Sequence, residues 1–197
     1  MTIIIASQIL SWAAIVGLGV LSFVLARQVG VLHERVAPAG ALSMNQKIKA
    51  GDIAPELTAQ TLSGELLPLG GARGSRSQLL FFLSPDCPVC KSLLPALKSA
   101  ALNEKRWIDV ALVSDGDGPH HLAFVREQGL QEFPYIVSEL VGRSYGVGKL
   151  PYAVLIDERG IIASMGLVNS REHLDSLFEA KELGVASIQE FLSRRAG

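Results

Sequence analysis

Leu79-Leu80-Phe81-Phe82-Leu83-Ser84-Pro85-Asp86-Cys87-Pro88-Val89-Cys90 joins an apolar run to the only two cysteines of the chain. Five consecutive apolar residues predict a buried strand. Pro88 suits the first turn of a helix, and apolar residues follow it at helical spacing as far as about Lys105. The two thiols therefore belong to a strand-to-helix turn, with Cys87 at the helix N-terminus and Cys90 one turn along the same face.

This placement of the two cysteines predicts redox chemistry. The unpaired amides and the positive end of a helix favour a thiolate at Cys87, and Cys90 is close enough in sequence to form a disulfide with it. The alternatives are half of a zinc site and a pair of incidental structural thiols. Zinc needs four ligands, and the four histidines offer no partner pair at ligand spacing. We predict two catalytic cysteines, no metal site and no cofactor.

Strand and helix signals alternate along the rest of the chain. Apolar segments on either side of Ser63-Gly64 predict a hairpin before the cysteine pair. The later signals predict strands at Trp107–Val113, Tyr135–Val137, Tyr152–Ile156 and Ile161–Leu167, and helices at His120–Gln128, Asn169–Lys181 and Ala186–Arg194. This alternation indicates an α/β fold with helices on both faces of one sheet.

The size and charge of the chain limit the possible functions. A chain of 197 residues is long enough for one domain of ordinary size with an appendage. Its formal net charge is −1 and charged residues make up 19% of it. Since no positive field exists to hold a polyanion, nucleic-acid binding is excluded as a predicted function.

The appendage is the N-terminal segment, because residues 1–26 carry no charged side chain. A helix over residues 3–26 would be about 36 Å long, enough to cross a hydrocarbon core of about 30 Å. A buried soluble helix and a cleaved signal peptide are the alternatives; the segment is too long for either and lacks a basic leader region. We predict a transmembrane anchor with its flank at 1–28, a linker at 29–50 and a globular domain at 51–197.

Two arguments about orientation disagree. The basic residues Arg27, Arg35, Lys47 and Lys49 follow the anchor, and the positive-inside rule would place the domain in the cytoplasm. Disulfides persist in oxidising compartments, so a cysteine pair that acts on them belongs outside the cytoplasm. We give more weight to the chemistry and predict a single-pass inner membrane protein with its domain in the periplasm.

The cysteine pair and Pro151 together resemble the thioredoxin fold. Pro151 directly precedes an apolar strand, where a proline cannot donate to the sheet; taken alone it would be an ordinary turn proline. In the thioredoxin family the matching proline is cis and lies beside the disulfide, and the backbone before it pairs with the substrate chain. The resemblance implies that Pro88, Val89, Leu150 and Pro151 bind substrate.

The residues from Gly51 to Leu57 resemble the start of the thioredoxin/peroxiredoxin-like branch, and Ser84 matches the hydroxyl residue that peroxiredoxins place before their reactive cysteine. However, Leu80 occupies the position of a peroxiredoxin proline, so peroxide reduction fits less well. The chain also departs from thioredoxin itself. Phe81 stands where thioredoxin has a buried aspartate that accepts the proton of the second cysteine, so Cys90 must use another group or water.

The most extensive resemblance is to the methylamine utilization protein MauD family. It is carried by residues 84–95, the N-terminal span and residues 149–155, and it covers nearly the whole chain. It implies a membrane-tethered thiol-disulfide exchange protein that matures the disulfide-rich small (beta) subunit of methylamine dehydrogenase, by forming or correcting its disulfides. The implied partners are this client and a redox protein that resets the cysteine pair. Two alternatives remain: a thiol-disulfide reductase for cytochrome c assembly, and a chaperone-like client-binding module with a structural disulfide.

Overall fold

The computed structural model describes residues 5, 8, 12, 15–20, 48–116 and 118–182. Its contacts divide the chain into two units, Met1–Ala41 and Leu42–Gly197. The first unit is described only at residues 5, 8, 12 and 15–20, which are helical. Among the described residues, no helix combines the length and the apolar character needed to cross a membrane. Most of the predicted anchor at 1–28, nearly all of the linker at 29–50 and the predicted helix Ala186–Arg194 lie outside the described residues, so they stay predictions.

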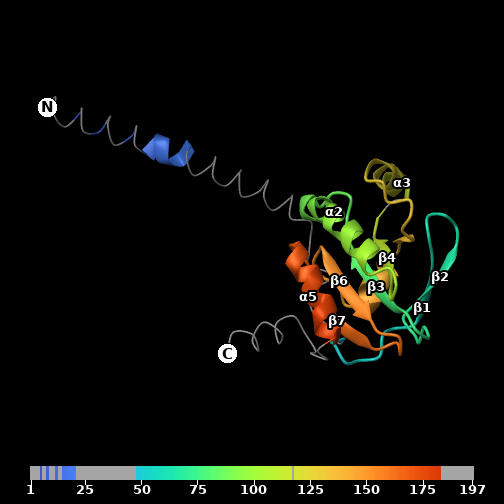
Figure 1. Ribbon diagram of the computed structural model, residues 1–197. Helices are drawn as coiled ribbons and strands as arrows, with labels where there is room; N and C mark the ends of the chain where they lie inside the picture. The colour runs from blue at the N-terminus through green and yellow to red at the C-terminus, as the bar shows by residue number, and fades with distance from the viewer. Residues whose placement is uncertain are drawn as a thin grey trace, which may run out of the picture. The chain divides into compact units, whose positions relative to one another are not determined.

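The second unit is built around a mixed five-stranded sheet (Figure 1). Its elements in chain order are β1 (Leu57–Gln60), β2 (Leu66–Leu69), β3 (Ser77–Phe82), α2 (Pro88–Asn103), β4 (Ile108–Ser114), α3 (Gly118–Glu127), β5 (Tyr135–Val137), α4 (Glu139–Ser144), β6 (Tyr152–Ile156), β7 (Ile162–Leu167) and α5 (Arg171–Glu182). The sheet has the order β5-β4-β3-β6-β7. Strands β3, β4 and β5 are parallel, whereas β6 and β7 run antiparallel to β3 and to each other.

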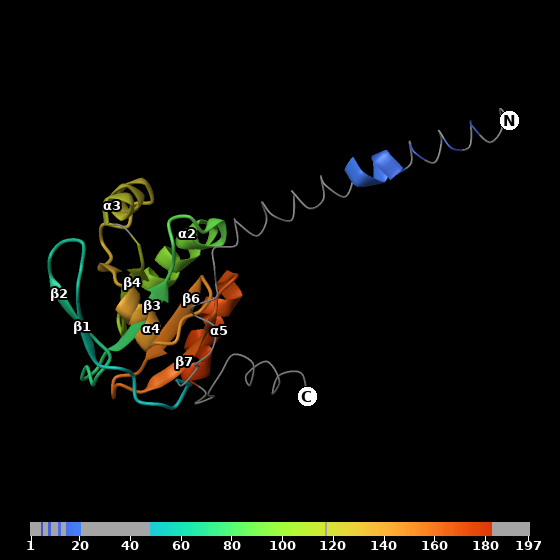
Figure 2. The same cartoon turned by 180° about the vertical axis from the view of Figure 1, so that it is seen from behind.

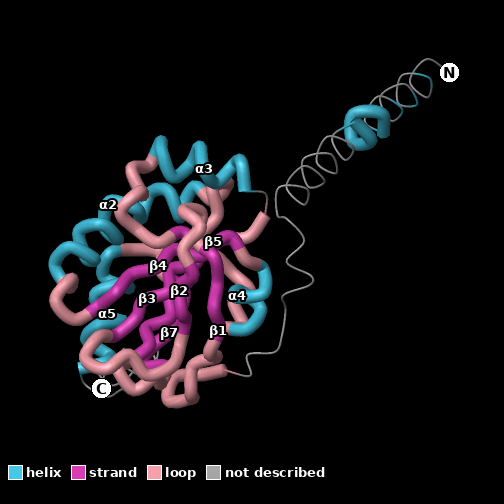
Figure 3. Tube along the Cα trace, turned by 90° about the vertical axis from the view of Figure 1, so that its right-hand side faces the viewer, coloured by secondary structure: helices cyan, strands magenta, loops and turns pink. Residues whose placement is uncertain are grey.

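The buried run in β3 supplies both faces of the core, because successive side chains of a strand point to opposite sides. Leu79 and Phe81 pack with residues of α2, α3 and α5. Leu80 and Phe82 pack on the other face with the β1–β2 hairpin and Val141 of α4. The strands lie between α2 and α5 on one side and α4 on the other (Figure 3). The predicted α/β fold with helices on both faces is confirmed.

The predicted order of elements is confirmed from the hairpin to α5, with ends that shift by a few residues. One element escaped prediction, the six-residue helix α4 that follows β5 (Figure 2). Ser138 caps this helix, since its Oγ accepts a hydrogen bond from Val141 N at 3.4 Å. The helix is short and only Val141 is buried, so it carries no helical periodicity that could be read from the sequence.

Candidate active site

The sheet register brings the predicted site residues to one edge. Phe82 at the end of β3 pairs with Tyr152 at the start of β6. The cysteine turn follows Phe82, and Pro151 directly precedes Tyr152. Because β4 is parallel to β3 and ends beside it, α3 also begins at this edge. Segments far apart in the sequence therefore surround Cys87.

Cys87 is the N-cap residue of α2, with Pro88 in the first turn as predicted. Its backbone is extended (φ −88°, ψ 109°), which turns the side chain back over the start of the helix. The backbone N–H of Cys90 donates a hydrogen bond to Cys87 Sγ at 3.1 Å. This sulfur therefore takes the place that a serine or aspartate oxygen usually fills at a helix N-cap. One backbone N–H donor and the positive end of the helix dipole therefore point at this sulfur.

Cys90 differs from Cys87 in its surroundings, although both are free thiols in this structure. Cys87 is partly exposed, whereas Cys90 is 0% exposed. Burial, and then the contact with Cys87, raise the pKa of the Cys90 thiol to about 12. Near neutral pH, Cys90 is therefore a protonated thiol. The arrangement suits Cys87 to react with a sulfur of another molecule and Cys90 to react afterwards within the protein.

The peptide bond between Leu150 and Pro151 is cis, as the thioredoxin resemblance implied. Pro151 is buried, and its carbonyl accepts a hydrogen bond from Val168 N at 3.0 Å, which joins this turn to the end of β7. Leu150 is 37% exposed and makes no backbone hydrogen bond to the described residues. As far as the described part of the chain shows, its N–H and C=O have no backbone partner and can pair with another chain.

The charged side chains nearest to the two cysteines in the sequence, Asp86 and Lys91, are exposed. Asp86, directly before Cys87, lies 3.4 Å from His120 Nε2 at the start of α3, and both side chains are well exposed. The ammonium of Lys91 lies 6.0 Å from the centre of the Phe124 ring. Asp86 and Lys91 are therefore both solvent-exposed residues at this edge of the sheet. Among the described residues, no group of three or more metal-ligating side chains comes together.

A buried polar pair that the sequence pattern did not predict lies on the same side of the sheet as Cys90. His121 is 2% exposed, and its Nδ1 lies 2.9 Å from the Tyr135 hydroxyl. Its Nε2 lies 2.9 Å from the carbonyl oxygen of Asp115. His121 follows Gly118-Pro119-His120 and reads as part of a helix start, so nothing in the sequence points to Tyr135 as its partner.

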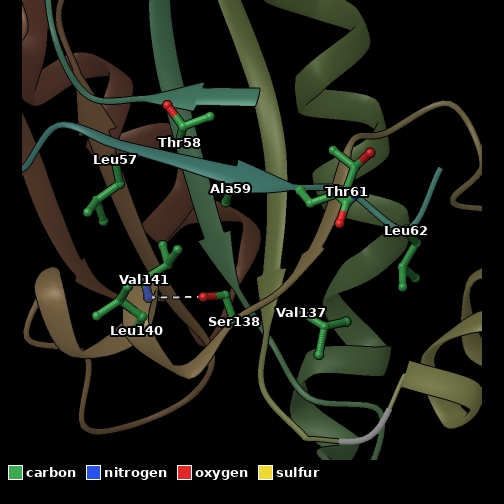
Figure 4. A pocket seen from close by; sticks show the side chains of 10 residues that line it. Leu57, Thr58, Ala59, Thr61, Leu62, Val137, Ser138, Leu140 and Val141 are labelled. Carbon is green, nitrogen blue, oxygen red and sulfur yellow. Dashed lines mark hydrogen bonds between the residues drawn. The ribbon is translucent and has the colours of Figure 1, made fainter. Parts of the chain in front are cut away.

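A pocket of about 390 Å³ lies between β1 and the segment from β5 to α4 (Figure 4). Its wall includes Leu57, Ala59, Val137, Leu140 and Val141. Neither cysteine lines it, nor does the turn at Leu150-Pro151. The candidate active site is therefore the exposed edge around Cys87, and this pocket is separate from it.

Comparison with known proteins agrees with this geometry. The model of the AhpC/TSA family matches residues 50–165. The methylamine utilization protein MauD of Paracoccus versutus is 45% identical over 195 residues, which cover 99% of this chain and 98% of that protein. MauD of Methylorubrum extorquens is 44% identical over 196 residues, 99% of this chain and 95% of that protein.

The structural comparison supports the fold. A thiol-disulfide oxidoreductase from Bacteroides fragilis has a similar structure, with a TM-score of 0.56 and 20% identity, over 65% of this chain and 98% of that protein. At this level of identity the likeness shows a shared thioredoxin-like fold. The alignments with the two MauD proteins cover nearly the whole chain. This chain is a member of the AhpC/TSA family and, within it, of the methylamine utilization protein MauD family.

Proposed function

We propose that the chain is a membrane-tethered thiol-disulfide oxidoreductase that uses Cys87 and Cys90. The observation that carries this proposal is the asymmetry of the pair. Cys87 Sγ is partly exposed at the N-terminus of α2 and accepts a hydrogen bond from Cys90 N, whereas Cys90 is wholly buried. An exchange protein needs one sulfur for its client and a second that reacts only within the protein.

The exchange proceeds through a mixed disulfide. When the protein oxidises its client, a client thiolate attacks Cys87 Sγ in the Cys87–Cys90 disulfide, and Cys90 leaves and takes up a proton. A second client thiolate then attacks the client sulfur of the mixed disulfide, and Cys87 leaves. When the protein opens a wrong client disulfide, these steps run in reverse. A separate redox partner restores the starting state of the pair.

The surface next to Cys87 suits an extended client segment. Val89 is 43% exposed and Leu150 is 37% exposed, and Pro88 is exposed between the two cysteines. These side chains offer apolar contacts, and the free backbone groups of Leu150 offer hydrogen bonds to a client strand. The client is thus held by its backbone and by apolar side chains close to its cysteine.

The client that we propose is the small (beta) subunit of methylamine dehydrogenase. Two observations support it: MauD relatives are named for methylamine utilization and match 99% of this chain, and the family resemblance implies maturation of this disulfide-rich subunit. We also propose that residues 1–28 anchor the protein in the inner membrane and that the domain lies in the periplasm, where such disulfides persist.

The proposed function is tested by trapping the client. In the Cys90→Ser variant Cys87 can still attack a client disulfide, but no thiol at position 90 can attack the resulting mixed disulfide, so the client should remain linked to Cys87. The variant replaces the wild-type chain in cells that produce methylamine dehydrogenase. The expected product is an adduct with the small subunit that appears on non-reducing gels and disappears on reduction. The double variant Cys87→Ser, Cys90→Ser is the control and should form no adduct.

Each other outcome points to a different function. An adduct with an apocytochrome and none with the dehydrogenase subunit would favour the reductase for cytochrome c assembly. Normal dehydrogenase maturation in the double-serine control would favour a chaperone-like module with no redox role. Failure to trap any protein while maturation depends on Cys87 would contradict the mixed-disulfide mechanism.

A further inference from the structure

The charge next to Cys87 affects the proposed exchange, and the following inference rests on that proposed function. A client thiolate that attacks the Cys87–Cys90 disulfide is an anion, and so is the Cys87 thiolate that attacks a client disulfide. A carboxylate close to Cys87 repels both of them. Asp86 directly precedes Cys87, and the Cα atoms of adjacent residues are about 3.8 Å apart. The position of the Asp86 carboxylate therefore bears on the rate of exchange.

The backbone of Asp86 is fixed by the turn that leads from β3 to α2. Its N–H donates a hydrogen bond to Ser84 Oγ at 3.3 Å. The N–H of Cys87 donates to the carbonyl oxygen of Ser84 at 3.1 Å. Pro85 lies inside this turn of residues 84–87, at a position where proline is favoured. The carboxylate can therefore move mainly by rotation of its own side chain between staggered positions.

The side chain of Asp86 has its contact on α3. Its Oδ1 lies 3.4 Å from Nε2 of His120. A neutral imidazole can carry its hydrogen on Nε2, and an imidazolium carries one on both nitrogens, so this nitrogen can donate towards the carboxylate in either state. The contact selects one of the staggered positions of Asp86 and gives its carboxylate a partner.

The buried histidine next to His120 fixes the start of α3. His121 Nδ1 lies 2.9 Å from the Tyr135 hydroxyl, and its Nε2 lies 2.9 Å from the carbonyl oxygen of Asp115. These contacts tie the first turn of α3 to β5 and to the end of β4. The ring of His120 lies 6.2 Å from that of His121. The buried polar pair thus holds in place the turn that presents His120 to Asp86.

We propose that His120 is a positioning residue for the exchange: it holds the Asp86 carboxylate and so weakens the repulsion of anionic sulfur groups at Cys87. Without the imidazole, the carboxylate has no ion-pair partner among the described residues and can rotate towards the cysteine. The effect is modest, because the side chains of His120 and Asp86 are 59% and 86% exposed. It changes the rate at which charged reactants attack at Cys87.

Other charged side chains at this edge are the same in every variant of the test. The N–H of Lys91 donates to the carbonyl oxygen of Cys87 at 3.1 Å, and its ammonium lies 6.0 Å from the centre of the Phe124 ring. Lys149 lies before the turn at Pro151, and Asp115 follows β4. Lys91, Lys149 and Asp115 are exposed, so solvent screens them. Their contribution cancels when variants are compared.

The test compares the alkylation of Cys87 by iodoacetate and by iodoacetamide, which differ in charge but hardly in size. The reduced full-length chain is used in a non-ionic detergent at about pH 8, where ordinary histidines are mostly neutral. In both reactions the thiolate displaces iodide and forms a thioether. Cys90 is buried, and the Cys87→Ser variant measures any reaction that it shows. The ratio of the iodoacetate rate to the iodoacetamide rate reports the charge near Cys87, because the amount of thiolate cancels in it.

In His120→Ala this ratio should fall by about threefold, since two unit charges about 6 Å apart in water repel each other by roughly that factor. His120→Gln keeps an N–H donor and should keep the wild-type ratio. Asp86→Asn should have a ratio at least as high as the wild type, and adding His120→Ala to it should change nothing. The fall in His120→Ala should disappear in about 1 M salt.

Arg143→Ala on α4 is the matched control. Arg143 lies 2.6 Å from Glu139, and the two side chains are 62% and 63% exposed. This variant also frees an exposed carboxylate, but on the other face of the sheet, so its ratio should equal that of the wild type.

Two results would overturn the inference: a wild-type ratio in His120→Ala, or an equal fall when His120→Ala is combined with Asp86→Asn. If either occurs while Cys90→Ser still traps its client, the proposed function stands and only the role of His120 fails. If Cys87 of the wild-type chain does not react even with iodoacetamide, the accessible sulfur that the proposed function requires is missing, and both fail.

Discussion

The two cysteines have different chemical roles because one helical turn places them in different surroundings. Cys87 lies outside the first turn of α2, where backbone donors are free, and Cys90 lies inside it and faces the core. A disulfide between them removes the cost of ionising Cys90, whereas the reduced state leaves a buried thiol. The difference should be measurable as a change in stability with pH.

We predict that the reduced protein loses stability at alkaline pH through Cys90. Burial raises the pKa of this thiol from 9.0 to about 12 in the folded state. Between these values the unfolded chain releases the proton and the folded chain retains it, so the free energy of unfolding falls as pH rises. The loss should be about 1.4 kcal/mol between pH 8 and 10. Urea unfolding at the two pH values measures it.

Cys90→Ala is the control for this prediction, because alanine has no proton to retain. The variant should lack about 1.4 kcal/mol of the alkaline loss, while the tyrosines with raised pKa contribute equally to both proteins. Equal losses in the wild type and in Cys90→Ala would show that the Cys90 thiol ionises as readily in the folded chain as in the unfolded one.

At the scale of residues, the sequence predicted the positions of residues that are neighbours in the chain. It did not predict contacts between residues that only the fold brings together. Cys87, Pro88 and Cys90 lie within one helical turn, so their spacing in the sequence predicts their relative positions. The cis peptide bond before Pro151 was implied only through the family resemblance. The contact between His121 and Tyr135 forms across 14 residues and two elements, and no periodicity connects them.

At the scale of elements, glycines allow the β1–β2 hairpin to pack against its neighbours. Gly70, after β2, has a φ of +73°, and a Cβ there would lie 2.3 Å from the carbonyl oxygen of Pro55. Gly64, in the hairpin turn, has a φ of +90° with open space around it. The two positions share the backbone requirement but differ in packing.

We predict that Gly70→Ala destabilises the protein by about 3 kcal/mol and Gly64→Ala by about 1 kcal/mol. Both variants carry the cost of a side chain at positive φ. Only Gly70→Ala must also move the backbone of Pro55, which is the source of the additional loss. Chemical denaturation of the three proteins measures the difference. A loss in Gly70→Ala no greater than that in Gly64→Ala would contradict the tight contact.

The elements with the clearest sequence signal are those with a long apolar pattern. The run in β3 is buried at every position, and α2 buries its apolar side chains at helical spacing. Helix α4 was missed because it is short, although its cap at Ser138 was a readable signal. The mixed direction of the strands also needed the structure, since the pattern of a buried strand is the same whether its neighbour is parallel or antiparallel.

At the scale of the whole molecule, the fold gathers all of the proposed chemistry at one edge of the sheet. The cysteine turn, the start of α3 and the turn at Leu150-Pro151 meet where β3 and β4 end and β6 begins. With the proposed anchor, the domain would act on clients on its own side of the membrane. The compartment that this edge faces therefore decides which clients it can reach.

We predict that Cys87 faces the periplasm and reacts with a membrane-impermeant maleimide in intact spheroplasts. The basic residues after the anchor argue for the opposite orientation. The disulfide chemistry requires an oxidising compartment, and we expect that requirement to prevail. The matched control carries Thr2→Cys together with Cys87→Ser and Cys90→Ser, which puts the only thiol before the anchor. This control should react only after lysis, whereas Cys87 should react before it. The reverse pattern would place the domain in the cytoplasm and remove the proposed client from its reach.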